Sequence, residues 1–525
     1  MWTRTYLLLL VVRIYFALAP SYIHPDENFQ GPEVIAETGN IYSFPHHLTW
    51  EFTSDKPVRS VFPLWPVYGL PMVVLHWIWS GIGTDEVPPQ VVYYTLRILM
   101  FILSFVLEDW AIHDLVQSPR YRKLAVTLVA SSYVTWTYQT HTFSNSVETL
   151  VVLWSLVMIQ RILDNKQRDS LLSSAILGLL LTFGVFNRIT FPAYVLVPCL
   201  YLVPHFLRKP FSLLALTTTT LLTTLLAIAI DTSFHQPTSP LLSTLLKSPT
   251  FTPLNSLLYN SNPSNLATHG LHPRYQHIFV SLPLLLGPSL SLLPSIRLSK
   301  PTTLPLLSAI SATLLLSLIP HQEPRFLLPA IPLILSSLHL PSSKTLTRYW
   351  LATWILFNAT MGILMGIYHQ GGVIPTQSYL GNQKPLSPHH IPEIIWWRTY
   401  SPPIWLLDHN PITTTDLMGI HFPALQSHVD AALGPECNSN RSIGLVAPWS
   451  SMELDEQWTD RDIVMEEVWR WNRHLNLDDL DVGREGMWET VRRVVGRRGL
   501  VVRRIRRVCQ DGGGGQGGGG LGGDW

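Results

Sequence analysis

Charged side chains are scarce in this sequence. Asp, Glu, Lys and Arg make up 14% of the 525 residues and apolar residues 47%, whereas a soluble globular protein carries about 25% charged residues. Charged side chains are costly in hydrocarbon and apolar ones are not. The composition therefore indicates a membrane protein.

Cysteine is also scarce, with three residues at Cys199, Cys437 and Cys509. They lie far apart and match no metal-binding spacing, which excludes a disulfide scaffold and leaves one bridge between Cys437 and Cys509 open. The net charge of +1 gives no reason to expect a nucleic-acid partner. A phosphate-binding glycine loop is missing too, since the glycines at 512–523 form a low-complexity tail.

Long apolar windows alternate with basic clusters along the first 370 residues. About 20 residues with few charges can cross a hydrocarbon core, and basic residues near span ends mark cytosolic loops. The clusters used as markers are Arg120/Arg122/Lys123, Lys166/Arg168, Arg208/Lys209, Arg297/Lys300 and Lys344/Arg348. They predict about eleven spans, near residues 6–19, 91–115, 124–138, 147–161, 170–186, 189–206, 211–230, 277–296, 302–319, 325–340 and 349–368.

The stretch 61–82 does not fit this scheme as a crossing. It is rich in proline, which interrupts helices, and in tryptophan, which favours the headgroup level, so it predicts a bent interfacial segment. An odd number of crossings from a cytosolic N-terminus places the polar loops 20–60 and 231–276 and the C-terminal region in the lumen. The sequon at Asn440 suits that location and predicts glycosylation there.

The chain is thus predicted to have three parts. A membrane domain covers 1–375, a lumenal region covers 376–510, and a Gly-rich disordered tail covers 511–525.

Four polar motifs stand at the ends of apolar runs, where ionisable groups are costly unless paired or used. Taken alone, each has an ordinary structural explanation: a solvated loop, a turn with a Glu-Arg pair, a loop start, or an arginine that reaches the headgroups. The motifs are His24-Pro25-Asp26-Glu27 within Tyr22–Gln30, His321-Gln322-Glu323-Pro324-Arg325, His369-Gln370-Gly371-Gly372, and Asn187-Arg188.

The first two motifs together resemble the lumenal mannosyltransferases of the GT-C fold, which is an all-α polytopic membrane fold with lumenal catalytic loops. These enzymes extend the N-glycan precursor or build the glycosylphosphatidylinositol (GPI) anchor. The extended motif Tyr22–Val34, the Gln-Glu-Pro-Arg form of the second motif and the segment His369–Val373 resemble the enzymes that add the fourth GPI mannose. The resemblance covers residues 1–375.

The resemblance implies an inverting α1,2-mannosyltransferase of the endoplasmic reticulum, with dolichyl-phosphate mannose as donor and a GPI glycolipid as acceptor. Inversion by a single displacement requires one base. Asp26 is the expected base, and Glu27 is the alternative base or a partner that orients His24 or the acceptor. His24, Gln30, His369 and Gln370 are expected to contact the acceptor or to support the site.

The leaving phosphate needs cationic donors. Arg325 is expected to bind it with His321 beside it, Glu323 to hold Arg325, and Arg188 to be a second phosphate-binding candidate. Because fixed cations meet the charge and no ligand cluster appears in the sequence, neither a metal nor a cofactor is expected. The membrane is an expected partner, and no obligatory protein partner is inferred.

Other functions remain open at this point. The N-glycan α-mannosyltransferases and the GPI third-mannose enzyme share the chemistry and differ in acceptor. A secondary transporter is disfavoured because the acidic pair lies at a membrane edge and no internal repeat is found. A non-catalytic scaffold would leave the Asp-Glu pair and the Glu-Arg turn without a purpose.

Overall fold

The computed structural model describes residues 2–37, 42, 44–82, 86–165, 167, 169–296, 303–383, 391–408, 410–434, 441–456, 458, 463–477 and 486–507. The chain divides into a membrane unit, Met1–Asn382 with Pro403–His409, and a C-terminal unit, Gln383–Pro402 with Asn410–Trp525. Several predicted features lie outside the described residues: Asn440, Cys437, Cys509, the tail 511–525 and the basic clusters at 166/168 and 297/300.

The membrane unit is built from long apolar helices. Among the described residues, five helical stretches are long and apolar enough to cross a membrane: Pro89–Leu115, Ser144–Asp164, Pro210–His235, His277–Pro294 and Lys344–Tyr368. Leu171–Asn187 and Leu304–Ser317 are shorter apolar helices. The prediction of a multi-pass membrane protein is confirmed, and the number of eleven spans stays a prediction.

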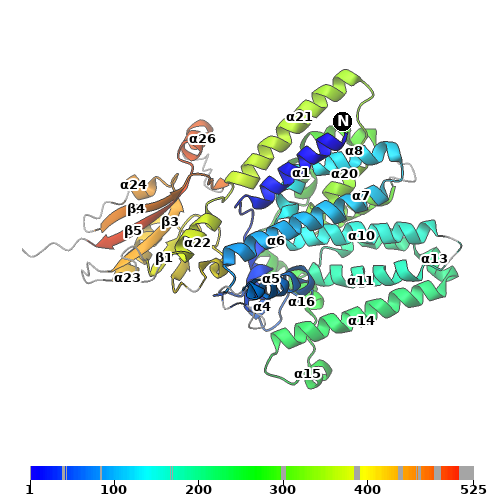
Figure 1. Ribbon diagram of the computed structural model, residues 1–525, viewed down its shortest axis with the longest axis horizontal. Coiled ribbons are helices and arrows are strands. Elements are labelled where there is room, and N and C mark those ends of the chain that lie inside the picture. Colours follow the sequence, from blue (N-terminus) through cyan, green and yellow to red (C-terminus); the bar gives the residue numbers. More distant parts are fainter. Residues whose placement is uncertain are drawn as a thin grey trace, which may run out of the picture. The chain divides into compact units, whose positions relative to one another are not determined.

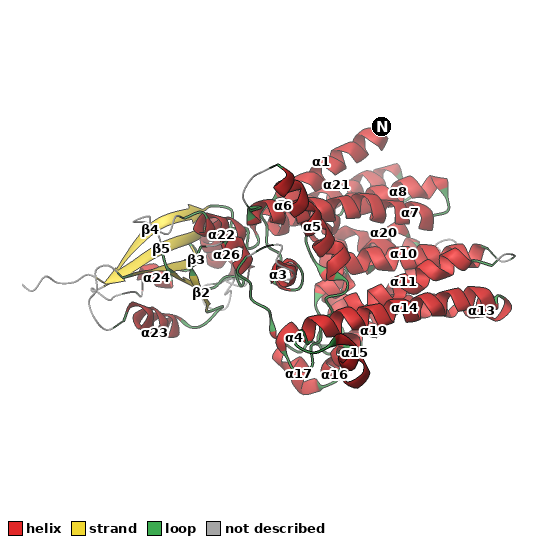
Figure 2. Ribbon diagram, turned by 60° about the horizontal axis from the view of Figure 1, so that its bottom comes forward, coloured by secondary structure: helices red, strands yellow, loops and turns green. Residues whose placement is uncertain are grey.

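The helix α10 (Ser144–Asp164) is buried along most of its length. It packs against α11 (Leu171–Asn187), which in turn packs against α14 (Pro210–His235), and the three run side by side (Figures 1 and 2). On α14, Leu221, Leu222, Leu225 and Leu226 are exposed. A helix with such an apolar outer face suits contact with lipid.

The remaining helices of the membrane unit are shorter or interrupted. The stretch expected to be bent forms a π-helix, Trp65–Gly69, that leads into α5 (Leu70–Gly81), each with a proline in its first turn. The others are α1 (Trp2–Leu18), α2 (Asp26–Phe29), α3 (Pro32–Glu37), α4 (Trp50–Thr53), α6 (Pro89–Leu103), α7 (Asp109–Leu115), α8 (Pro119–Ala130), α9 (Tyr133–Thr137), α12 (Pro192–Leu200), α13 (Val203–Arg208), α15 (Leu241–Lys247), α16 (Thr252–Asn260), α17 (Pro263–Thr268), α18 (Leu282–Leu286), α19 (Thr303–Ser317), α20 (Ala330–Ser336), α21 (Lys344–Ile363) and α22 (Val373–Gly381).

A buried arginine fixes the end of α1. The guanidinium of Arg97, on α6, donates to the backbone carbonyls of Phe16 at 3.0 Å, Ala19 at 3.3 Å and Ser21 at 3.4 Å. These carbonyls lack helical partners at a C-terminus, and a cation there is favourable. Arg97 therefore anchors the chain just before the His24–Glu27 motif.

The C-terminal unit contains a mixed sheet (Figure 2). The sheet has five strands in the order β2-β1-β3-β5-β4. Its strands are β1 (Glu393–Trp396), β2 (Thr413–Asp416), β3 (Ser442–Pro448), β4 (Ile463–Trp471) and β5 (Leu500–Arg507), and its helices are α23 (Phe422–Leu433), α24 (Glu453–Glu456) and α26 (Met487–Gly496). The β1 strand pairs in parallel with β2 and β3, and β5 pairs antiparallel with β3 and β4.

The expectation of an all-α protein is wrong for this unit. Strand β3 is buried from Ile443 to its end and packs with α23 through Leu445 and Leu425. Short apolar runs of four to eight residues are typical of buried strands. They stabilise a sheet only by pairing with distant segments, which a search for membrane spans does not detect.

Candidate active site

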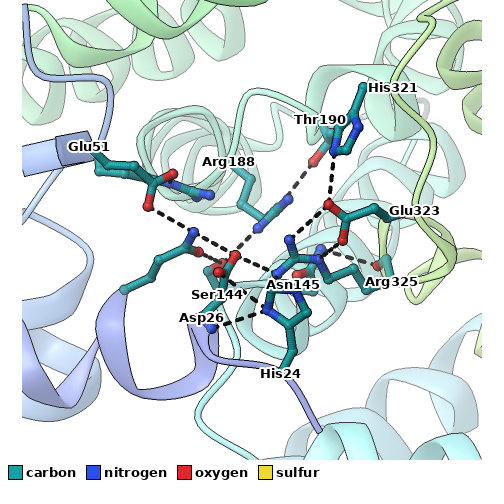
Figure 3. A network of polar contacts seen from close by, with 12 residues as sticks. His24, Asp26, Glu51, Ser144, Asn145, Arg188, Thr190, His321, Glu323 and Arg325 are labelled. Atoms are coloured by element: carbon teal, nitrogen blue, oxygen red, sulfur yellow. Dashed lines mark hydrogen bonds and ion pairs between the residues drawn. The ribbon is translucent and has the colours of Figure 1, made fainter. Parts of the chain in front are cut away.

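A cavity of about 660 Å³ opens in the membrane unit. Its wall combines the segment after α1, the end of α11, the region of α16 and α17, and the turn that follows α19. Its polar lining includes His24, Asp26, Glu51, Arg188, Glu323 and Arg325. Figure 3 shows these side chains converging on one another.

The two main motifs meet at Arg325. Its guanidinium donates to Asp26 and to Glu323, and its Nη1 lies 3.2 Å from His24 Nδ1 (Figure 3). Asp26 also accepts from Gln30 Nε2 at 2.6 Å and lies 3.3 Å from His24. The guanidinium of Arg325 thus binds the carboxylates of both Asp26 and Glu323, which are 297 positions apart in the sequence.

This arrangement keeps both carboxyls ionised. Burial alone would raise the pKa of Asp26, but Arg325 and His24 outweigh it and hold that pKa well below its usual range. Burial is outweighed at Glu323 too, where Arg325 and His321 lower the pKa. At neutral pH, Asp26 can therefore accept a proton.

Local geometry explains the direction of these side chains. The ring of Pro25 restricts the backbone at the start of α2 (φ −53°), and Asp26 begins the single helical turn. Near the second motif, Gln322 donates to the carbonyls of Ser317 and Ile319 at 3.0 Å, which caps the end of α19. The turn beyond it is fixed because Asn145 donates to the carbonyl of Arg325 at 3.1 Å.

His321 lies between two acceptors. Its Nδ1 is 3.0 Å from the carbonyl of Gly270, and its Nε2 is 2.8 Å from Glu323 Oε1. Both ring nitrogens donate in this arrangement, which only the imidazolium form can do. The hydrogen bond to Glu323 is the main cause that raises the pKa of His321.

The raised pKa of His321 predicts a pH-dependent stability. A raised folded-state pKa contributes stability that is complete below the unfolded value of 6.5 and is lost as pH rises through the folded pKa. The melting temperature of the wild type should therefore exceed that of His321→Gln most below pH 6.5, and the gap should narrow above it. Thermal unfolding in detergent over that range measures the gap, with exposed His428→Gln as control; a gap that widens with pH would contradict the assignment.

Arg188 stands at the end of α11 and faces the same cavity. Its Nη1 donates to Ser144 at 2.8 Å and its Nε to Thr190 at 3.4 Å (Figure 3). The same Nε is 3.4 Å from Glu148. A guanidinium has five N–H groups. Among contacts of the described residues, Arg188 uses two of them and Arg325 four. Arg188 therefore keeps more donors for a ligand than Arg325 does.

Gln30 connects the base candidate to a further ion pair. Its Nε2 donates to Glu51 at 2.9 Å as well as to Asp26, and Glu51 is paired with Arg59 at 3.0 Å. Its Oε1 accepts from Ser144 at 3.3 Å. Gln30 and Arg325 thus both donate to the same oxygen of Asp26, Oδ2.

Three predicted residues do not line this cavity. Glu27 is 1% exposed, and burial raises its pKa to about 8; its carboxylate lies 3.8 Å from His141. His369 and Gln370 are buried after α21, and burial lowers the pKa of His369 to about 4.

Glu51 and Arg59 line the cavity and Glu148 contacts Arg188, and none of the three was expected from the sequence. Glu148 lies in the apolar run 147–161, and an acidic residue inside a span is by itself a sign of function. The sequence therefore contains a signal that points to Glu148. Glu51 and Arg59 lie in an ordinary polar loop, so only packing reveals their place.

Within the described part of the chain, no group of three or more His, Cys, Asp or Glu side chains is placed to hold a metal ion. The cationic groups on the cavity are Arg59, Arg188, Arg325 and His321. Chemically, the site can bind an anion at its arginines and accept a proton at Asp26.

Comparison with known proteins places the chain in a family. The model of the Alg9-like mannosyltransferase family matches residues 4–409. Proteins named GPI mannosyltransferase 4 are 50% identical in Aspergillus oryzae, covering 97% of this chain and 99% of theirs, and 38% identical in Yarrowia lipolytica, covering 90% and 95%. The crystal structure of ArnT from Cupriavidus metallidurans bound to undecaprenyl phosphate is similar with a TM-score of 0.49 and 11% identity, covering 96% of this chain and 98% of ArnT.

The family match spans far more than half of the chain and includes every residue of the cavity. The mannosyltransferase resemblance of the sequence motifs is thereby confirmed. The chain belongs to the Alg9-like mannosyltransferase family.

Proposed function

We propose that this enzyme transfers mannose from dolichyl-phosphate mannose to the third mannose of the GPI-anchor precursor, in the lumen of the endoplasmic reticulum. The transfer adds the fourth mannose through an α1,2 bond on a GT-C scaffold. The names of its full-length relatives support the acceptor. The observation that carries the chemistry is the meeting of Asp26 with Arg325 and Arg188 on one cavity.

The reaction is a single displacement. The acceptor's 2-hydroxyl oxygen attacks C1 of the donor mannose while its proton passes to Asp26. The bond from C1 to the phosphate oxygen breaks, and dolichyl phosphate leaves with the electron pair. Attack opposite the leaving group converts the β-linked donor into an α-linked product.

Arg188 and Arg325 bind the phosphate oxygens and stabilise the charge that develops there. Glu323 orients Arg325 through two hydrogen bonds. A bound phosphate competes with Asp26 for Arg325, which weakens the hold on the carboxylate. Asp26 therefore becomes more basic when the donor is in place.

The experiment that tests the acceptor uses cells that lack the fourth-mannose GPI enzyme. Expression of this chain should remove the accumulated trimannosyl GPI intermediate and produce the tetramannosyl form, read out by mass spectrometry of the lipid-linked glycans. If expression of this chain instead corrects cells that lack an N-glycan mannosyltransferase or the third-mannose enzyme, the acceptor must be reassigned.

A chelator should leave transfer unchanged. The guanidinium groups supply the charge stabilisation that a metal would otherwise give to the leaving phosphate. In membranes treated with EDTA and assayed without added divalent ions, transfer should stay within about twofold of the untreated value. A strong loss that Mn²⁺ or Mg²⁺ restores would contradict metal independence.

The active site should face the lumen. After the native cysteines are replaced, Ser261→Cys at the cavity should react with a membrane-impermeant reagent only from the lumenal side, and Arg120→Cys, in the first turn of α8, only from the cytosol. Intact and permeabilised microsomes separate the two cases. Cytosolic labelling at position 261 would place the site on the wrong face for this proposal.

A further inference from the structure

An aromatic surface forms one side of the active-site cavity. Trp50 begins α4, Tyr259 lies near the end of α16, and His269 follows α17. The ring of Trp50 lies 4.8 Å from that of Tyr259 and 5.8 Å from that of His269. All three residues line the cavity, and we call them the aromatic wall.

The wall is held in shape by contacts among its own members. The hydroxyl of Tyr259 is 2.9 Å from Nε2 of His269, and their rings are 5.9 Å apart. Asn265 donates to the carbonyl of Tyr259 at 3.1 Å, which ties the two segments together. Trp50 nevertheless stays 43% exposed, a large open area for an indole. Exposed aromatic surface beside polar groups is typical of a binding site.

The wall is continuous with the reacting groups. The His269 ring lies 5.9 Å from that of His321, and His321 is hydrogen-bonded to Glu323 at 2.8 Å. Glu323 in turn holds Arg325, which contacts Asp26. A ligand resting on the wall therefore extends toward the base.

The chemistry of the wall favours a sugar. A pyranose presents C–H groups on its faces and hydroxyls at its edge. The negative faces of aromatic rings attract C–H groups, and the Tyr259 hydroxyl and the His269 ring can meet the hydroxyls. None of the three carries a permanent positive charge, whereas the phosphate-binding arginines stand with the other motifs of the cavity.

We infer that the aromatic wall is the subsite for the acceptor glycan, with a mannose ring packed on Trp50. This inference rests on the proposed function. It assigns Trp50 and Tyr259 to acceptor binding and leaves the donor phosphate to Arg188 and Arg325. A donor lipid chain on the wall is the competing occupant.

Steady-state kinetics separate the two occupants. With a synthetic trimannosyl GPI acceptor and dolichyl-phosphate mannose, Trp50→Ala should raise the acceptor KM about tenfold and leave the donor KM unchanged. Trp50→Phe, which keeps an aromatic face, should recover most of the loss. Trp488→Ala, at a 75% exposed tryptophan of α26, is the control and should match the wild type.

Each outcome tests either the acceptor subsite or the proposed function. A raised donor KM, or an unchanged acceptor KM in the Trp50→Ala enzyme, overturns the subsite while wild-type transfer upholds the function. A Phe variant as impaired as the Ala variant also overturns it, because an aromatic face would then not be what matters. If the wild type transfers no mannose to this acceptor, the proposed function fails, and the subsite fails with it.

Discussion

Replacing Asp26 by Asn should lower mannose transfer by ~10² or more while the protein remains folded. The amide keeps the size of the side chain and can still accept from Gln30 and Arg325, but it cannot take up the acceptor's proton. Transfer from dolichyl-phosphate mannose to a trimannosyl GPI acceptor measures the effect. Blotting of the amount and thermal unfolding in detergent establish that the variant is folded.

Glu27 provides the matched control for this experiment. Because burial raises its pKa to about 8, Glu27 is mostly protonated at neutral pH, and Gln is a close mimic of a protonated Glu. Glu27→Gln should therefore retain much more activity than the Asp26 variant. If the Asp26 variant is near normal and the Glu27 variant is inactive, the base is Glu27. If both remain active, the His24–Glu27 motif is structural and the mechanism is wrong.

Replacing Arg325 by Lys should also lower transfer by about 10², although the charge is kept. The guanidinium of Arg325 contacts Asp26 and Glu323 at the same time. A single ammonium cannot hold Glu323 and at the same time offer a phosphate the forked pair of N–H groups that a guanidinium offers. The loss should appear in kcat as well as in the donor KM, since the negative charge on the phosphate grows as the transition state is approached.

Arg161→Lys is the control for the arginine experiment. Arg161, near the end of α10, pairs with Asp114 at 2.6 Å, and its side chain is 47% exposed. An exposed ion pair of this kind contributes little, so the variant should be near normal. Normal turnover in Arg325→Lys, at equal expression, would remove Arg325 from the phosphate site and leave Arg188 as the remaining candidate.

The sheet of the C-terminal unit was not predicted from the sequence. Strand β3 pairs with β5, so that Val446 stands opposite Val502. The two strands are short, and each is stabilised mainly by partners remote in the chain. The membrane helices differ in this respect, because the length and apolar character that let a helix cross lipid are local properties. This difference explains why the multi-pass membrane character could be predicted from the sequence and the sheet could not.

The sequence by itself determined the membrane character of the chain and the two motifs that meet at the cavity, because both features lie in contiguous residues along the chain. Only the tertiary structure decided that Asp26, and not Glu27, lines the cavity. Neighbours on a helical turn point roughly 100° apart, so one of two adjacent acids faces the cavity while the other is buried. Which of the two acids faces the cavity depends on how α2 packs, and that packing exists only in the folded chain. The same is true of the contact between Asp26 and Arg325, which are 299 positions apart in the sequence.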